Sequence, residues 1–108
     1  DGVQISGNLK ASGGDFNIIG ASGTGNGVTV SGDDTTVDNV NVTGITETGS
    51  GVSIAGNLTS KGDSAITGTA SNGGMGVDLS GNVTSTAETS ISGTSSKGGT
   101  GVNLHGEV

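Results

Sequence analysis

The sequence contains no cysteine, proline, tryptophan, tyrosine or arginine, and Phe16 is its single phenylalanine. Without cysteine the chain can form neither disulfides nor thiolate metal sites, which suits a protein exported through an oxidising compartment. Without arginine it lacks the side chain that clamps carboxylates and phosphates in a bidentate manner. No apolar run approaches the ~20 residues that span a bilayer, so we expect no membrane insertion.

Basic residues are scarce as well. Three lysines stand against ten acidic residues, and the formal net charge is −7. Nucleic acids and anionic membranes attract basic surfaces, so we expect neither as a partner. The single histidine, His105, occupies a position that serine or alanine fills in the other repeats, on the outward face of a strand. The sequence therefore predicts no catalytic residues, no cofactor and no enzymatic activity.

Small polar residues and 24 glycines dominate the chain, and only 28% of its residues are hydrophobic. Such a composition could indicate disorder, because little apolar surface is available to offset the entropy lost on folding. However, most of the apolar residues are valine, isoleucine or leucine, and β-branched side chains favour strands. A flexible linker would not need them, so we expect an all-β fold.

A repeat of about 25 residues, a length typical of solenoid proteins, runs through the whole sequence. The dipeptide Gly-Val opens a similar phrase in each copy, at near-constant intervals of which the second is one residue shorter than the others. These phrases are GVQISGNL, GVTVSGDD, GVSIAGNL, GVDLSGNV and GVNLHGEV. The repeats divide a single domain into coils at residues 2–26, 27–50, 51–75 and 76–100, followed by a partial coil at 101–108.

Apolar and polar residues alternate in the opening phrase, as where Val52 and Ile54 flank Ser53. Alternation of this kind predicts a strand with one buried face. Two further apolar phrases in each repeat predict a second and a third short strand. We expect the core to contain Val3, Ile5, Val28, Val30, Val42, Val52, Ile54, Leu58, Ile66, Val77, Leu79, Val83, Ile91, Val102 and Leu104.

Three short strands per repeat could form an antiparallel meander or a solenoid. A meander does not require the same side chain at a fixed interval, whereas in a solenoid these residues become vertical neighbours about 4.8 Å apart. The near-constant period therefore favours a right-handed parallel β-helix with about 25 residues per coil. The second repeat departs from the pattern, because Asp33, Asp34 and two threonines replace its Gly-Asn-Leu phrase. There we expect an irregular or shifted strand, with Val37 or Val40 in place of the missing leucine.

Asparagine or an acidic residue recurs at one position of the repeat, namely at Asn8, Asp33, Asn57, Asn82 and Glu107. Stacked asparagines can form an amide ladder, and we expect Asn8, Asn57 and Asn82 to form one along a corner. Asn41, Asn57 and Asn82 also begin Asn-x-Thr sequons. Repetition in a chain rich in asparagine and threonine accounts for these sequons without glycosylation.

Two sequence features could bind cations. The phrase GGMGVDL at residues 73–79 approaches the calcium nonapeptide of toxin β-rolls, but Ser80 replaces the required apolar residue and the phrase does not recur every nine residues. Asp33, Asp34 and Asp38 form the densest acidic group, which we interpret as a solvated loop, with a weak cation site as the alternative. We therefore expect no metal centre.

Threonines align between repeats, with Thr67 beside Thr43 and Thr69 beside Thr94. Ice binding requires long, regular threonine ladders, and no long two-column array emerges here. The sequence therefore does not favour ice binding.

The phrases GVSIAGNLTSKGDSAITGTASNGGMGVDLSGNV and ISGTSSKGGTGVNLHG resemble the repeats of large filamentous-haemagglutinin-like exoproteins of Gram-negative bacteria. That group includes haemagglutinin adhesins and contact-dependent inhibition exoproteins, which leave the cell by two-partner secretion. The resemblance covers essentially the whole chain. It implies a β-helical rod that is secreted or displayed on the bacterial cell surface, and the family's rod repeats contribute no catalytic residues.

We therefore expect a non-catalytic rod or display segment of an adhesin-like protein, whose partner is a receptor or glycan on a host or neighbouring cell. The alternative is a carbohydrate- or receptor-binding module in which an outward ladder of side chains is the ligand surface. The opening phrase begins at Gly2 and still runs at Val108. We accordingly expect a segment of a longer rod, with open ends that favour end-to-end self-association.

Overall fold

A computed structural model describes residues 2–11, 14–36 and 38–108. All regular elements within these ranges are β-strands. Their bounds are β1 (Val3–Ile5), β2 (Leu9–Ala11), β3 (Phe16–Ser22), β4 (Val28–Val30), β5 (Asp34–Thr36), β6 (Val40–Thr46), β7 (Ser50–Ile54), β8 (Leu58–Ser60), β9 (Ser64–Ala70), β10 (Met75–Leu79), β11 (Val83–Ser85), β12 (Thr89–Ser95) and β13 (Thr100–Leu104). No helix in this part of the chain is long and apolar enough to cross a membrane.

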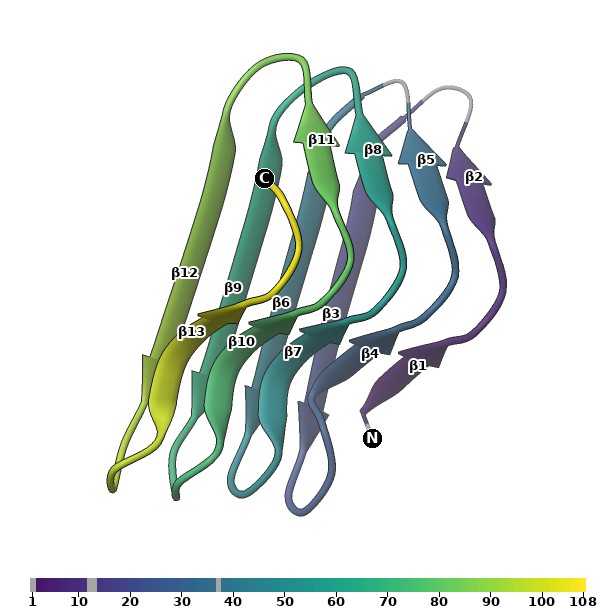
Figure 1. Ribbon diagram of the computed structural model, residues 1–108. Helices are drawn as coiled ribbons and strands as arrows, with labels where there is room; N and C mark the ends of the chain where they lie inside the picture. The colour runs from purple at the N-terminus through teal and green to yellow at the C-terminus, as the bar shows by residue number, and fades with distance from the viewer. Residues whose placement is uncertain (1, 12–13, 37) are drawn as a thin grey trace.

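The strands form three parallel sheets, which the chain visits in turn during each coil (Figure 1). Sheet A has the order β1-β4-β7-β10-β13, sheet B the order β2-β5-β8-β11, and sheet C the order β3-β6-β9-β12. The strands of sheet C are the longest, with 7 residues each. Because consecutive strands of one sheet belong to consecutive coils, the fold is a stack in which each full coil contributes three strands. The coil length agrees with the repeat length of the sequence.

The stack is right-handed. In Figure 1 the chain rises on the near side through β1 and β2, crosses over, and descends on the far side through β3 before it enters the next coil. Seen from the N-terminal end, this path turns clockwise as it recedes, which is the hand that crossover connections between parallel strands almost always take. The expectation of a right-handed parallel β-helix is confirmed.

Equivalent residues of successive repeats are direct neighbours in the sheets. In sheet A, Val52 lies between Val28 and Val77, and in sheet C, Ile66 lies between Val42 and Ile91. Each core position is therefore a column of similar side chains. Parallel pairing alone would tolerate other residues, but a column of matched β-branched side chains packs without gaps along the stack.

The expectation of an irregular strand in the second repeat is wrong. Strand β5 pairs in register with both β2 and β8, and Asp34 stands beside Leu9 and Leu58. The strand stays regular because its ladder depends on backbone groups, which the neighbouring coils supply whatever the side chain. Val40 does not replace the leucine either, since it begins β6 beside Phe16, and Val37 lies outside the described residues.

The repeat that is one residue short loses its residue in a turn. Leu9 of β2 pairs with Asp34 of β5, whereas Asn17 of β3 pairs with Asn41 of β6, so the separation of partners in the sequence falls by one between these two pairs of strands. The change falls in the connection between the second and third strands of the coil. A turn absorbs a deletion that would reverse every side chain of a strand.

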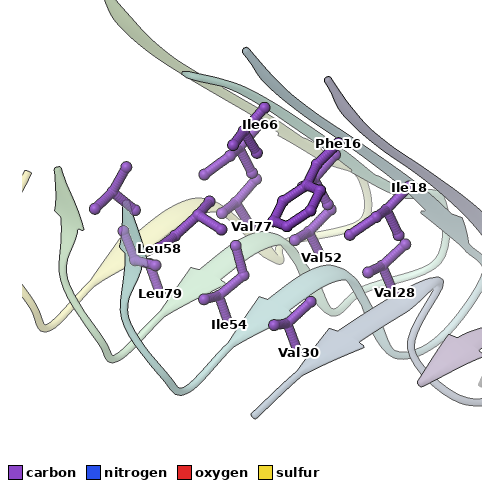
Figure 2. Close-up of a cluster of buried hydrophobic side chains, with 13 residues drawn as sticks. Phe16, Ile18, Val28, Val30, Val52, Ile54, Leu58, Ile66, Val77 and Leu79 are labelled. Atoms are coloured by element: carbon purple, nitrogen blue, oxygen red, sulfur yellow. The ribbon is translucent and has the colours of Figure 1, made fainter. Parts of the chain in front are cut away.

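Aliphatic side chains from all three sheets fill the interior, together with the ring of Phe16 (Figure 2). Ten of the residues expected in the core are buried, namely Val28, Val30, Val42, Val52, Ile54, Leu58, Ile66, Val77, Leu79 and Val83. Val3, Ile5 and Ile91 are partly buried and pack against this cluster. Phe16, Ile18 and Val40 complete it.

Two residues expected in the core are exposed. Val102 and Leu104 are 39% and 48% accessible to solvent. Both belong to β13, which pairs with β10 on one side and has no strand on the other. Their assignment to the buried core is therefore wrong for this chain, because one of the two neighbours that would cover them is absent.

Buried glycines bring sheets A and C close together. A Cβ atom at Gly44 would overlap the carbonyl oxygen of Gly51, and one at Gly68 would overlap that of Gly76. These glycines recur because the adjacent backbone leaves no space for a side chain, rather than because they need a left-handed conformation.

Candidate functional surfaces

Asparagine and acidic side chains form a ladder along the corner between sheets A and B. The Oδ1 atom of Asn8 accepts a hydrogen bond from the backbone N–H of Asp33 at 2.8 Å, and the same bond links each member to its equivalent in the next coil. The distances are 3.0 Å from Asp33 to Asn57, 3.2 Å from Asn57 to Asn82 and 3.0 Å from Asn82 to Glu107. An amide ladder would require the side chains to bond to one another. Here they accept hydrogen bonds from backbone N–H groups instead.

A second ladder, which the sequence reasoning missed, follows the corner between sheets B and C. Asp15, Asn39 and Asp63 each accept a hydrogen bond from the backbone N–H one coil further on, at 3.0, 2.8 and 3.1 Å, and Glu88 donates the last of these. The signal was available, because an acidic residue or asparagine precedes the third strand of every repeat. At both corners a side chain replaces the interstrand bond that the turning backbone cannot make.

The three aspartates that formed the densest acidic group in the sequence do not meet. Asp33 is exposed in the first ladder, Asp34 is buried, and the Oδ2 atom of Asp38 accepts a hydrogen bond from Gly14 at 2.8 Å. Among the described residues, no group of three or more histidine, cysteine or acidic side chains could hold a metal ion. Only Asp34 belongs to a strand, β5, where its side chain lies in the core, while Asp33 and Asp38 lie in the connections before and after that strand.

Asp34 is the one acidic side chain found in the described core. It is 1% exposed, and its Oδ1 atom accepts a hydrogen bond from the backbone N–H of Leu9 at 3.0 Å. Its Oδ2 atom is buried without a hydrogen-bond partner. Burial raises the pKa of this carboxyl group and the bond from Leu9 opposes the rise, while the neighbouring Asp33 charge adds to it. Because the side chain faces inward and no other acidic side chain shares the described core, we interpret it as a group that destabilises the fold and not as a catalytic acid.

A cluster of serines lies inside the corner between sheets B and C. Ser60 and Ser64 are buried, and their hydroxyl oxygens are 2.9 Å apart. Ser60 also bonds to the carbonyl oxygen of Gly62, and Ser85 bonds to that of Glu88. A nucleophilic serine needs a neighbouring base, and these hydroxyls bond to each other and to carbonyl groups. The cluster therefore satisfies buried polar atoms and provides no nucleophile.

The remaining candidate residues lie apart from one another. Asp78, in the calcium-like phrase, is half-buried on the outer face of sheet A, and its Oδ1 atom accepts a hydrogen bond from Asn103 at 2.9 Å. His105 is exposed beyond the end of β13. Of the sequon asparagines, Asn41 lies on the outer face of sheet C and donates to Asn17 at 3.0 Å.

A cavity of about 500 Å³ opens beside β11 in the last coil. Its lining consists of Asn82, Val83, Thr84, Ser85, Thr89, Glu107 and Val108. Glu107 is the single titratable group among them.

The outer face of sheet C differs from the rest of the surface in charge. Its outward side chains form three columns across four coils, and all are uncharged: Asn17, Ile19, Ala21, Asn41, Thr43, Ile45, Ala65, Thr67, Thr69, Ser90, Ser92 and Thr94. By contrast, the outer columns of sheets A and B include Asp78 and Lys10. We call these twelve side chains the neutral face. It is the most extensive regular surface that the described chain offers to a partner.

Comparisons with family models, with curated proteins and with solved structures give no match to this chain.

Proposed function

We propose that this chain is a non-catalytic rod or display segment of a secreted or surface-exposed bacterial protein of the filamentous-haemagglutinin-like type. The observation that carries the proposal is the unbroken register of all three sheets from coil to coil. Such a stack is a one-dimensional object in which each coil contacts only its neighbours. Its length is therefore set by the number of coils, at ~4.8 Å per coil, as a spacer requires.

The arrangement of polar groups supports the same role. The two corner ladders connect each coil to the next through hydrogen bonds between side chain and backbone. Every bond of this kind crosses from one coil to its neighbour, so the ladders resist separation of the coils. A rod that projects a binding or toxin domain from a cell must resist that separation.

Deleting one whole coil tests the spacer role. Removal of residues 51–75 joins Ser50 to Gly76. Val77 and Leu79 of β10 then take the places of Val52 and Ile54 in β7, which are their partners in sheet A. We expect this variant to keep a cooperative thermal transition and a β-sheet circular dichroism spectrum. Removal of residues 51–62, about half a coil, is the matched control and should abolish the transition. If both deletions behaved alike, the coils would not be the modular units of a spacer.

The cellular location is tested on the producing bacterium. We expect protease added to intact cells to cleave this segment, or the segment to be found in the culture medium, while a cytoplasmic marker stays intact. Protection of the segment until the cells are lysed would contradict the proposed location.

The alternative function is binding of a carbohydrate or receptor on an outward ladder of the solenoid. The neutral face is the surface that favours it, because its columns repeat at the coil spacing. A glycan array probed with the 108-residue chain separates the two functions. Binding that Thr67→Lys abolishes, and that Thr59→Lys on sheet B preserves, would favour the binding module over the rod.

The ends of the stack suggest an additional association. Strand β13 presents Val102 and Leu104 next to an unpaired sheet edge, and such an edge can pair with another chain. We infer that the isolated 108-residue chain associates end to end. Leu104→Lys should weaken this association, as measured by sedimentation at increasing concentration, because a lysine on an edge opposes strand addition.

A further inference from the structure

The neutral face carries two large apolar side chains that are more than half exposed. Ile19 is 75% exposed and Ile45 is 52% exposed. The other exposed large hydrophobic residues that the structure describes, Leu9, Val102, Leu104 and Val108, belong to the first coil and to the final partial coil. Ile19 also belongs to the first coil, on β3 at the edge of sheet C, whereas Ile45 projects from β6, which pairs with both β3 and β9. The exposure of Ile45 therefore does not come from a missing neighbouring strand.

The side chains of the neutral face differ in size, so the face is not flat. Along sheet C, Ile19 precedes Thr43 and Thr67 in one column, and Ala21 precedes Ile45 in the next. Ile19 and Ile45 therefore form knobs, and Ala21, which is next to both, forms a hollow. A planar crystalline surface such as ice would meet columns of unequal height, whereas a second protein surface could interdigitate with them.

The chemistry of the face excludes some partners and favours others. It bears no charge, so ion pairing to a partner is not available. It also contains no aromatic ring on which a sugar could stack, since the chain has no tryptophan or tyrosine and Phe16 is buried. Burial of this face would remove no charged group from water, so the association avoids the desolvation cost of a charge.

A second copy of the chain matches the face in its spacing. Its columns repeat at the coil spacing of ~4.8 Å, and another copy has the same spacing by construction. Two such faces can pack as stacked sheets do, ~10 Å apart. We propose that two copies of this chain associate side by side through their neutral faces, in a symmetric pair. The association is lateral, so it differs from the end-to-end contact inferred above and does not depend on the rod function.

The area buried between two neutral faces indicates how strongly the two copies should associate. Four strands of seven residues cover roughly 450 Å² per copy at ~4.8 Å between strands and ~3.3 Å per residue. A pair therefore buries about 900 Å² in total, below the ~1,200 Å² at which stable specific interfaces begin. The pair formed by this length of chain is weak, and it forms at concentrations near the millimolar range. Added salt strengthens it, because two chains of charge −7 repel one another until they are screened.

Sedimentation equilibrium of the 108-residue chain, combined with amide chemical shifts, tests the proposal. We expect the average mass to rise from 10.1 kDa toward twice that value as concentration increases, and shifts to change at the neutral face. Leu104→Lys is included throughout to suppress end-to-end contacts. In this background, Ile45→Lys and, separately, Thr67→Lys should lower the association constant at least tenfold, whereas the control Thr59→Lys on sheet B should leave it within twofold. Unchanged melting temperatures verify that each variant folds.

Several results would contradict lateral pairing. A chain that stays monomeric at millimolar concentration, or a dimer that both neutral-face lysines leave intact, would overturn lateral pairing. So would chemical shifts that move on the neutral face only when a neutral oligosaccharide is added, since that result assigns the face to a glycan. Association that weakens as salt is added would show that charges, and not this face, hold the copies together.

Discussion

The carboxylate of Asp34 occupies a position that leucine fills in the adjacent coils, beside Leu9 and Leu58. It is 1% exposed, and one of its two oxygens has no hydrogen-bond partner. Leaving such a group unsatisfied costs ~1–3 kcal/mol, and a buried leucine side chain contributes ~1.5–3 kcal/mol. Asp34→Leu should therefore remove a penalty and add apolar contact at one position.

Two opposing effects reduce that gain. The backbone N–H of Leu9 loses its acceptor, the Oδ1 atom of Asp34. In the equivalent place two coils on, Leu58 donates to the backbone carbonyl of Asn82 instead, and Leu9 can donate to Asp33 in the same way. The larger side chain can also overpack the coil, at a cost of ~1–3 kcal/mol. We expect a net gain of about 2 kcal/mol at pH 7 and a melting temperature higher by on the order of 10 °C.

The stability gained by Asp34→Leu should depend on pH. Because burial raises the pKa of Asp34 in the folded state, the folded protein binds this proton more tightly than the unfolded chain, whose aspartates titrate near ~3.9. The contribution of Asp34 to stability is then fully present below about pH 4 and is lost as pH rises through the raised pKa. The advantage of Asp34→Leu over the original protein should therefore be larger at pH 7 than at pH 4.

Urea denaturation at both pH values measures these differences in the free energy of unfolding. Asp33→Asn is the control, because Asp33 is exposed and asparagine fills its ladder position in three other coils. It should change stability by less than ~0.5 kcal/mol. If Asp34→Leu were less stable than the original protein at pH 7, or if its advantage were the same at both pH values, the reasoning about a buried, unsatisfied carboxylate would be refuted.

Three further predictions concern the core, the glycines and calcium. Ile66→Asp should destabilise the protein by ~3 kcal/mol or more, whereas Thr59→Asp on the outer face of sheet B should cost little, and equal melting temperatures would mean that the strand faces are misassigned. Gly44→Ala should lower the free energy of unfolding by ~1–3 kcal/mol, because the new Cβ would overlap the Gly51 carbonyl oxygen. Gly23→Ala should be nearly neutral, because open space surrounds that site. A harmless Gly44→Ala would contradict the close approach of sheets A and C. Millimolar calcium should leave the melting temperature unchanged, since a ligand that bound the native state would raise it, and a rise of ten degrees would restore the case for a calcium site.

The fold could be predicted from the sequence because the repeat places equivalent residues one coil apart. Val28, Val52 and Val77 recur at a near-constant interval, and parallel stacking at a fixed spacing is the arrangement that uses such a period. The position of Asp34 could not be predicted in this way. Hydrophobic patterning assigns a carboxylate to the surface, whereas here the backbone ladder of two adjacent coils holds β5 in register and carries the side chain inside.

The surfaces were only partly predictable. The alignment of the repeats placed Thr67 beside Thr43, but the chemistry of a face emerges only when four coils are aligned, and the absence of charge on sheet C is not visible in any single strand. The hydrogen bonds of the corner ladder also differed from expectation. An asparagine such as Asn57 can bond to another side chain or to the backbone, and the turn, which leaves the N–H of Asn82 without a strand partner, decides between them.

The most direct test of the stacked-coil account uses the absence of cysteine. Thr59 and Thr84 are one full repeat apart in sequence, are partners in sheet B, and both point outward. Their Cα atoms, ~4.8 Å apart in a parallel sheet, lie within the span of a disulfide. The double variant Thr59→Cys/Thr84→Cys should form an intramolecular disulfide under mild oxidation of the folded protein, seen by mass spectrometry as the loss of two hydrogens from the monomer. The control pair Thr59→Cys/Thr94→Cys, whose members lie in different sheets, should keep both thiols. A disulfide in the control but not in the stacked pair would contradict the parallel stacking of one repeat on the next.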